Sequence, residues 1–330
     1  MDYDFFRAHS GSMETTFESL VRAEFAPKST YLNTASSGLL PARSVTALQE
    51  AVRIRAEGLP LDPLFADVEA ARASFARLAG VPVTRVAAGA SVSSQSGLVA
   101  ASLPPGAEVL TAEGDFSAVV NPFHTRGDLK VRAVPLERLA ESVRPGTALV
   151  AVSAAQSADG RIADLTALRE AALAHGARTY VDYSQAAGWL PVRADAFDYT
   201  VSTTFKWLLG PHGAAFLVVP EDFGALVPIL AGWVSGEIPR DSCYGPVQEL
   251  AHSARRFDVS PALFTYTGTR HSLALIEELG VDAVPAHDMA LAARSRAGLA
   301  ELGTSRCPHP ARRSSPCPDS APVSPSWPPP

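Results

Sequence analysis

One lysine of this sequence has unusual neighbours. Lys206 lies between Phe205 and Trp207, in an otherwise uncharged segment with hydroxyl groups before it and a Gly-Pro break after it. The other lysines of the chain are Lys28 and Lys130. Apolar surroundings disfavour the charged form of a lysine and lower its pKa, which leaves a neutral amine that can attack a carbonyl. Lys206 is therefore a candidate Schiff-base lysine. The alternative is a lysine whose stem lies on apolar surface while its ammonium reaches water.

Two further groups of residues could serve a site with such a lysine. Asp182 ends a short apolar run, and its carboxylate can cap a helix or hold a proton on a ligand. Gly89-Ala90-Ser91 opens a helical pattern, and small residues at a helix N-terminus leave backbone N–H groups free to hold an anion. Ser91 is equally explained as an ordinary N-cap. The small and polar run at residues 31–41 either lets backbone approach a ligand closely or is a plain connection.

The elements that position these residues follow a strand–helix rhythm. Short β-rich runs lie at residues 83–87, 108–111, 130–134, 147–152, 178–181, 199–202 and 214–219. Helical patterns lie at residues 41–57, 63–79, 91–102, 136–143, 165–175, 264–279 and 287–302. This alternation predicts an α/β fold with a mainly parallel seven-stranded sheet and helices on both faces. Ligands of such sheets bind beyond the carboxyl ends of the strands, where Ser91, Asp182 and Lys206 fall.

Composition excludes several classes of partner. The formal net charge of -6 gives no electrostatic reason to expect nucleic acid or an anionic membrane. No apolar run is long enough to span a bilayer, and the N-terminal residues are acidic where a signal peptide is basic. The 3 cysteines do not make a disulfide framework, so we expect reduced thiols and a cytoplasmic location.

Other catalytic motifs are missing or imperfect. The histidines are scattered without a His-x-x-x-His pair and no Cys-x-x-Cys occurs, so we expect no metal site. No strand end carries a dinucleotide fingerprint or a P-loop. Residues 89–93 begin like a nucleophile elbow but lack its second glycine. Residues 203–206 imitate a Ser-x-x-Lys motif with Thr203 in place of serine, which leaves acyl transfer by serine or threonine as one alternative.

The C-terminal residues 304–330 differ in kind from the rest. One residue in three is proline and no hydrophobic period survives, so this tail cannot bury a core and we expect disorder. The change follows abruptly after an amphipathic pattern that ends at Gly303. A coding sequence rich in arginine codons would give such a run when read out of frame, so we expect that an unrelated tail replaces the native segment. Resequencing across codon 303 tests this, and an intact reading frame would contradict it.

Taken together, the residues at the strand ends resemble the class V aminotransferase family of pyridoxal phosphate enzymes, which includes cysteine desulfurases, kynureninases and isopenicillin N epimerase-like proteins. The resemblance covers residues 31–303. Its most specific parts are Val181-Asp182-Tyr183-Ser184-Gln185-Ala186-Ala187-Gly188 and Thr203-Thr204-Phe205-Lys206-Trp207-Leu208-Leu209-Gly210-Pro211. Support comes from Gly89-Ala90-Ser91, Glu113-Gly114-Asp115-Phe116 and Ser157-Ala158-Asp159-Gly160. The resemblance implies the fold of pyridoxal phosphate-dependent transferases.

The resemblance also implies roles around the cofactor ring. Lys206 resembles the lysine that forms the Schiff base and later moves the Cα proton. Asp182 resembles the carboxylate that pairs with the pyridinium nitrogen and so keeps the ring an electron sink. Gln185 resembles the side chain that hydrogen-bonds the phenolic oxygen of the ring. Ser157 stands where the family often has an asparagine at the same oxygen, and Phe116 resembles the aromatic residue that stacks on the ring.

Further roles follow at the two ends of the cofactor. Ala90, Ser91 and Thr203 resemble the phosphate cup, which would use the helix N-terminus. Asn33 lies in a loop that approaches the substrate in relatives. The resemblance therefore implies an enzyme that acts on an amino acid or related amine by transamination, epimerisation or lyase chemistry. It also implies a homodimer, because relatives build each active site from two subunits.

The sequence departs from the family at several points. Phe205 stands where relatives often have histidine. The chain becomes proline-rich where the small C-terminal domain of relatives begins, so we expect that domain to be incomplete. Relatives bind the substrate carboxylate with an arginine from that domain, and no residue of this chain matches it. Cys243 is not in the context of a desulfurase cysteine, so desulfuration is not expected. The alternative function is a truncated, catalytically impaired remnant that binds pyridoxal phosphate at most.

The expected domain organisation has four parts. Residues 1–40 form an N-terminal segment with the substrate-side loop, and residues 41–280 form the large cofactor-binding domain. Residues 281–303 form a helix that leads toward the small domain, and residues 304–330 form the proline-rich tail.

Overall fold

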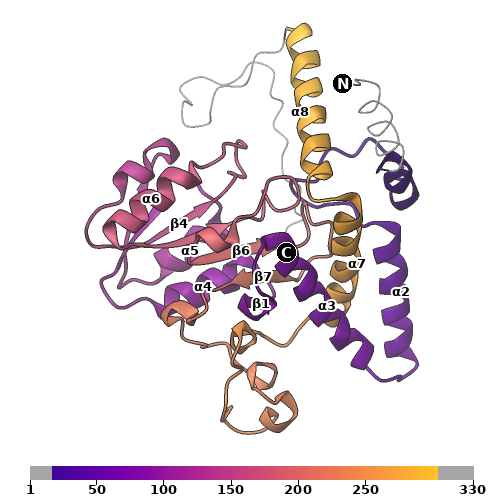
Figure 1. The fold of residues 1–330 in the computed structure, drawn as a ribbon, viewed down its shortest axis with the longest axis horizontal. Helices are drawn as coiled ribbons and strands as arrows, with labels where there is room; N and C mark the ends of the chain where they lie inside the picture. Colours follow the sequence, from indigo (N-terminus) through magenta and orange to yellow (C-terminus); the bar gives the residue numbers. More distant parts are fainter. Residues whose placement is uncertain (1–16, 304–330) are drawn as a thin grey trace, which may run out of the picture. The chain divides into compact units, whose positions relative to one another are not determined.

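A mixed sheet of seven strands organises the protein (Figure 1). The computed structural model describes residues 17–303, so the expectations for the tail at 304–330 lie outside the described residues. The strand order is β1-β7-β6-β5-β4-β2-β3. Strands β2 to β6 are parallel, whereas β7 is antiparallel to both β6 and β1. The strands are β1 Val86–Gly89, β2 Glu108–Ala112, β3 Lys130–Val134, β4 Thr147–Ser153, β5 Arg178–Asp182, β6 Tyr199–Thr203 and β7 Ala215–Val218.

This topology confirms the predicted α/β fold with a mainly parallel sheet. Because β1 runs antiparallel to β7, it points the same way as β2 to β6. The carboxyl ends of six strands therefore meet at one edge of the sheet, which is where such folds bind ligands.

Helices cover both faces of the sheet. They are α2 Ala42–Ala56, α3 Asp62–Ala79, α4 Val92–Ser102, α5 Ser117–Thr125, α6 Leu165–His175 and α7 Leu263–Leu279. Alternate strand residues divide the core, since Val181 of β5 packs in a cluster with α3 and α7, and Tyr180 packs in a cluster with α4 and α5. Helix α6 covers the β2 and β4 residues that face away from α4. Helices α2, α3 and α7 lie side by side (Figure 1).

Three local expectations differ from the structure. Residues Val83–Arg85 form a 3₁₀ turn after Pro82, so the first strand starts later than its β-rich run. The helical pattern at 136–143 is two short 3₁₀ turns, Leu136–Arg138 and Ala140–Ser142. Helix α5 was not expected, because Pro122 lies inside it and proline removes a backbone donor.

The chain divides into two compact units at residue 285. Helix α8 Ala283–Glu301 crosses this boundary, and over its described length it carries no buried residue. In the part of the chain that the structure describes, no helix combines the length and the apolar character needed to cross a membrane.

Candidate active site

Lys206 lies in the turn that follows β6, and it is buried. Its exposed fraction is 6%, which argues against the alternative of a side chain that extends its ammonium into solvent. Burial lowers the pKa of Lys206 and is the largest cause of the shift, while the nearby Asp182 carboxylate acts in the opposite direction. Within residues 17–303 its Nζ takes part in no ion pair and lies 4.9 Å from the centre of the Phe116 ring. The amine is therefore held closer to its neutral, nucleophilic form than a surface lysine.

Asp182 is the last residue of β5 and is 3% exposed. Its Oδ1 accepts a hydrogen bond of 2.8 Å from the backbone N–H of Ser184. Burial raises the pKa of Asp182 to about 6; Ser184 and Lys206 oppose the shift, while Asp115 adds to it. A carboxylate with little exposure and one cationic neighbour is costly to keep charged, so this position favours a ligand that offers a proton.

Phe116 lies beside Lys206 because Asp115 fixes the turn after β2. Asp115 Oδ1 accepts the Phe116 N–H at 2.6 Å, and its Oδ2 accepts the N–H of Ser153 at 2.8 Å. These two bonds tie the turn to the end of β4. Phe116 is 43% exposed as a residue, so its side chain faces Lys206 while part of it remains open for contact. Asp115 was missed as a site residue, although it lies within the Glu113-Gly114-Asp115-Phe116 motif.

Ser91 acts as the N-cap of α4. Its Oγ accepts a hydrogen bond of 3.2 Å from the N–H of Ser94, so the N-cap interpretation is correct. The first backbone N–H groups of a helix have no partner within the helix and remain available to an anion. Ala90 is exposed at this point, directly after β1. Thr203 is buried at the end of β6, and its hydroxyl donates a long bond of 3.4 Å to the Ala214 carbonyl.

Gln185 connects three segments around the site. Its Nε2 donates to the Ala35 carbonyl at 2.9 Å and to Ser157 Oγ at 3.1 Å. Its Oε1 accepts from the indole N–H of Trp207 at 2.9 Å. The structure therefore brings Ser157 and Gln185 together. Both N–H groups of the Gln185 amide are directed at protein oxygens.

The N-terminal loop lies against the lysine segment. The Gly38 N–H donates to the Phe205 carbonyl at 2.7 Å. A Cβ on Gly38 would lie 2.2 Å from the Lys206 carbonyl oxygen, so only glycine allows this approach. Asn33 is exposed at the start of the same loop, where its carbonyl accepts the N–H groups of Ser36 and Ser37. The loop is thus a backbone contact of the site and more than a plain connection.

A pocket of about 220 Å³ adjoins these residues. Its lining includes Ala35, Ser157, Gln185, Trp189 and Trp207. The indole N–H groups of both tryptophans donate to Gln185, one to its backbone carbonyl and one to its side chain. The rings therefore offer mainly hydrocarbon to the pocket.

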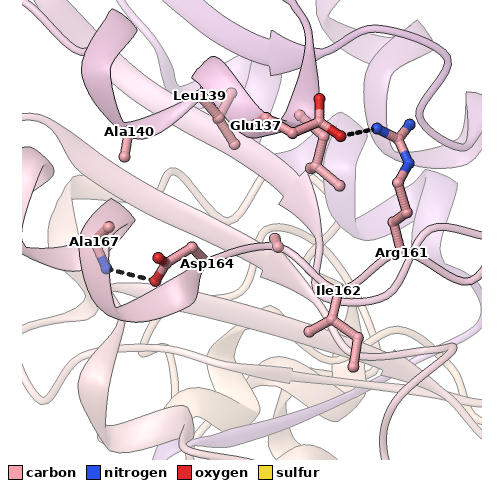
Figure 2. Close-up of a pocket in the computed structure, with 9 residues that line it drawn as sticks. Glu137, Leu139, Ala140, Arg161, Ile162, Asp164 and Ala167 are labelled. Atoms are coloured by element: carbon pink, nitrogen blue, oxygen red, sulfur yellow. Dashed lines mark hydrogen bonds and ion pairs between the residues drawn. The ribbon is translucent and has the colours of Figure 1, made fainter.

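A larger pocket of about 400 Å³ lies elsewhere (Figure 2). Arg161 pairs with Glu137 on one side of it, and Asp164 accepts the N–H of Ala167 at the start of α6. The pocket shares no residue with the Lys206 site. Its charged groups already have partners within the protein, so its size alone does not mark it as a reaction centre.

Two other kinds of site find no support. Over residues 17–303, no group of three or more His, Cys, Asp or Glu side chains could hold a metal ion. In the same range the hydrogen-bond partners of the Ser91 hydroxyl are Ser93 and Ser94, neither of which can act as a base. An acyl-transfer nucleophile needs such a base, so Ser91 lacks its second residue. The base of the other candidate, Thr203, would be Lys206, but the Thr203 hydroxyl donates to the Ala214 carbonyl instead.

The family model described as aminotransferase class V matches residues 31–318. The chain belongs to this family. Its curated relatives include the uncharacterized aminotransferase YcbU of Bacillus subtilis, which is 30% identical over 71% of this chain and 65% of the relative. Isopenicillin N epimerase of Amycolatopsis lactamdurans is 30% identical over 65% of this chain and 61% of that protein. The chain thus spans less than two thirds of these class V relatives.

Solved structures show the same fold. The cysteine desulfurase of Thermococcus onnurineus has a TM-score of 0.71 and 23% identity, over 83% of this chain and 74% of that one. The cystine C-S lyase C-DES has a TM-score of 0.69 and 23% identity, over 77% of this chain and 73% of that one. A variant of that lyase was solved with glycine covalently linked to its pyridoxal phosphate cofactor. Membership of the class V family implies pyridoxal 5′-phosphate as the cofactor.

Proposed function

We propose that this chain is a pyridoxal 5′-phosphate-dependent enzyme that acts on an amino acid or a related amine, with Lys206 as the residue that attaches the cofactor. The observation that carries the proposal is the buried Lys206 beside the buried Asp182, at the carboxyl edge of the sheet. Transamination, epimerisation and lyase chemistry all begin from this arrangement.

The residues present fit the cofactor. Lys206 is buried without an ion pair among the described residues, which suits an amine that bonds to a carbonyl carbon. Asp182 is a buried carboxylate that would accept the pyridinium N–H. Phe116 offers an open aromatic face next to Lys206. In the protein alone the buried amine and the buried carboxylate are unfavourable, and the exposed aromatic ring is unused. The carbonyl carbon, the pyridinium N–H and the ring face of the cofactor would match these three features in turn.

We assign the remaining contacts by their positions. Ala90, Ser91 and Thr203 would hold the phosphate at the N-terminus of α4. Ser157 and Gln185 are bonded to each other, and this pair would contact the phenolic oxygen of the cofactor ring. Because the Gln185 N–H groups already bond to Ala35 and Ser157, this contact requires one of those bonds to be exchanged.

The bound cofactor supplies an electron sink for the charge that develops at the substrate Cα. Lys206 would attach the cofactor through its amine and would be the base for the Cα proton, and its lowered pKa suits both tasks. Asp182 would hold a proton on the ring nitrogen of the cofactor by offering a negative charge. With a pKa of about 6, this carboxyl group is mostly ionised at neutral pH.

The substrate side of the site has fewer fixed residues. The pocket beside Gln185 would take the substrate side chain, between the Ala35 loop and the rings of Trp189 and Trp207. Asn33 lies at the start of the loop that contains Ala35, and it would contact the substrate from that loop. We also propose residues 41–280 as the cofactor domain, residues 281–303 as a connecting helix, and a homodimer as the assembly. A cytoplasmic location stays a prediction.

Borohydride reduction tests the central assignment. Wild-type protein mixed with pyridoxal phosphate and then reduced should carry the cofactor on the peptide that contains Lys206, as read by mass spectrometry. Lys206→Ala should carry none. Lys130→Ala is the matched control because Lys130 is exposed on β3, and it should be labelled like wild type. Labelling that persists in Lys206→Ala, or wild type that takes up no cofactor, would contradict the proposal.

The alternative is a chain that binds the cofactor and turns nothing over. The chain matches only 65% and 61% of the length of two curated relatives, so activity has to be tested separately from cofactor binding. Spectral titration of the loaded protein with a panel of amino acids separates the two. A change in the cofactor spectrum with any amine supports the enzyme, whereas no change across the panel supports the alternative.

A further inference from the structure

Strand β1 leads into the N-terminus of α4, and it lies at the edge of the sheet. Within residues 17–303 its one strand neighbour is β7. The polar backbone groups on its other side are bonded mainly by buried side chains, although the Ala88 carbonyl accepts the backbone N–H of Val259 at 3.4 Å. Asp258 Oδ1 accepts the Ala88 N–H at 2.7 Å, and Arg72 Nη1 donates to the Val86 carbonyl at 2.8 Å. These two residues take the place of a further strand.

Arg72 and Asp258 fix one another. Arg72 Nη2 lies 2.6 Å from Asp258 Oδ2, and Nη1 lies 3.1 Å from Oδ1, so the pair is bidentate. Both residues are buried. Arg72 belongs to α3 and Asp258 follows the 3₁₀ turn Ala254–Phe257, so the pair connects two distant segments to β1. A bidentate arginine–carboxylate pair has little geometric freedom.

Tyr266 of α7 holds the last residue of the same strand. Its buried hydroxyl lies 2.8 Å from the Gly89 carbonyl oxygen and 3.1 Å from the Ala215 carbonyl oxygen. Gly89 and Ala215 are paired residues of β1 and β7. A phenol has one hydrogen to donate, so the two carbonyls share it. Burial raises the pKa of Tyr266, which keeps it a donor.

Helix α4 closes on Gly89 from another direction. A Cβ on Gly89 would lie 1.8 Å from Gln95 Nε2, so a larger residue here would have to displace the Gln95 amide. Gln95 is itself buried in the first part of α4. The position of Gly89 is thus set by contacts with both Tyr266 and Gln95. Ala90 and Ser91, the proposed phosphate contacts, follow directly.

We infer that Arg72, Asp258 and Tyr266 are positioning residues for the cofactor phosphate, because they fix the strand end from which the phosphate-binding turn departs. This inference rests on the proposed function. None of the three is among the proposed phosphate contacts, which are Ala90, Ser91 and Thr203. Hydrogen bonds weaken steeply with misalignment, so a shift of Gly89 weakens the bonds that the turn makes to an anion. The ring contacts of Asp182 and Phe116 come from other strands and stay in place.

The test compares pyridoxal phosphate with pyridoxal, which lacks the phosphate. Tyr266→Phe removes only the hydroxyl. Its affinity for pyridoxal phosphate should fall about tenfold while its affinity for pyridoxal stays near the wild-type value. Tyr199→Phe is the matched control, because the Tyr199 hydroxyl also donates to a glycine carbonyl, that of Gly224. Tyr199 is the first residue of β6, at the end of the strand away from the Lys206 turn. The control should keep the wild-type ratio of the two affinities.

The outcomes separate the inference from the proposed function. An unchanged affinity ratio in Tyr266→Phe, or an equal loss for both ligands, overturns the inference while leaving cofactor binding intact. Wild-type protein that binds neither ligand overturns the proposed function itself. If Tyr266→Phe does not fold, Arg72→Lys provides the second measurement. It keeps the charge but loses the bidentate fork, and the inference requires the same selective loss for pyridoxal phosphate.

Discussion

The buried Asp182 makes a quantitative prediction for the protein without its cofactor. Its pKa is raised from 3.8 to about 6, mainly by burial. A raised carboxyl pKa means that the folded state binds the proton more tightly than the unfolded state. The stability that this gives is fully present below about pH 4 and is lost as the pH rises through about 6, and the loss amounts to about 3 kcal/mol.

Asp182→Asn isolates this contribution, because asparagine stays neutral at every pH. Urea unfolding of both cofactor-free proteins should be measured from about pH 4 to about pH 7. Relative to the variant, wild type should lose about 2.4 kcal/mol of unfolding free energy over that range, which is most of the total. Shared effects of pH on the rest of the molecule cancel in the difference. A difference that stays constant with pH would refute the reasoning, because it would mean that Asp182 is not a buried, destabilised carboxylate.

Other predictions concern the segments around the site. Asp258→Asn removes the buried charge partner of Arg72 and leaves only its ion pair with the exposed carboxylate of Glu69, so urea unfolding should show a loss of about 3 kcal/mol. The double variant Arg72→Met with Asp258→Leu should recover much of that loss, and a sum of two independent losses would contradict the pairing. Gly38→Ala places a Cβ 2.2 Å from the Lys206 carbonyl oxygen and 2.9 Å from the Leu209 side chain, so it should cost about 1–3 kcal/mol of unfolding free energy. It should also shift the spectrum of bound cofactor, and wild-type behaviour in both assays would show that the loop does not contact the lysine segment.

Much of the fold could be predicted because parallel strands follow a simple rule. Short apolar runs between helices gave the sheet, and the parallel direction places the residues after each strand at one edge. This is why Asp182, Ser91 and Lys206 could be expected near one another. The antiparallel direction of β7 could not be predicted, because a buried strand has the same apolar pattern in either direction.

Only those site residues could be predicted whose type and immediate neighbours point to a chemical role. Lys206 is one of them, because a lysine in an apolar segment is expected to be buried. The bonds of Gln185 could not be predicted, because its side-chain partners come from three segments and one of them is 150 residues away. Asp258 and Tyr266 were missed for the same reason. Their partners are backbone groups of β1, which leave no pattern in the side-chain sequence.

The bond between Tyr266 and Gly89 joins residues 177 positions apart, and this separation has a consequence for synthesis and refolding. The turn at Ala90 is made early by the ribosome, whereas α7 emerges only after every strand of the sheet. Contacts of such long range form late, after the loop between them has been closed. Tight cofactor capture should therefore be one of the last events on the folding pathway. The appearance of bound cofactor during refolding then reports completion of the domain, and added cofactor should stabilise the end state without accelerating the early steps.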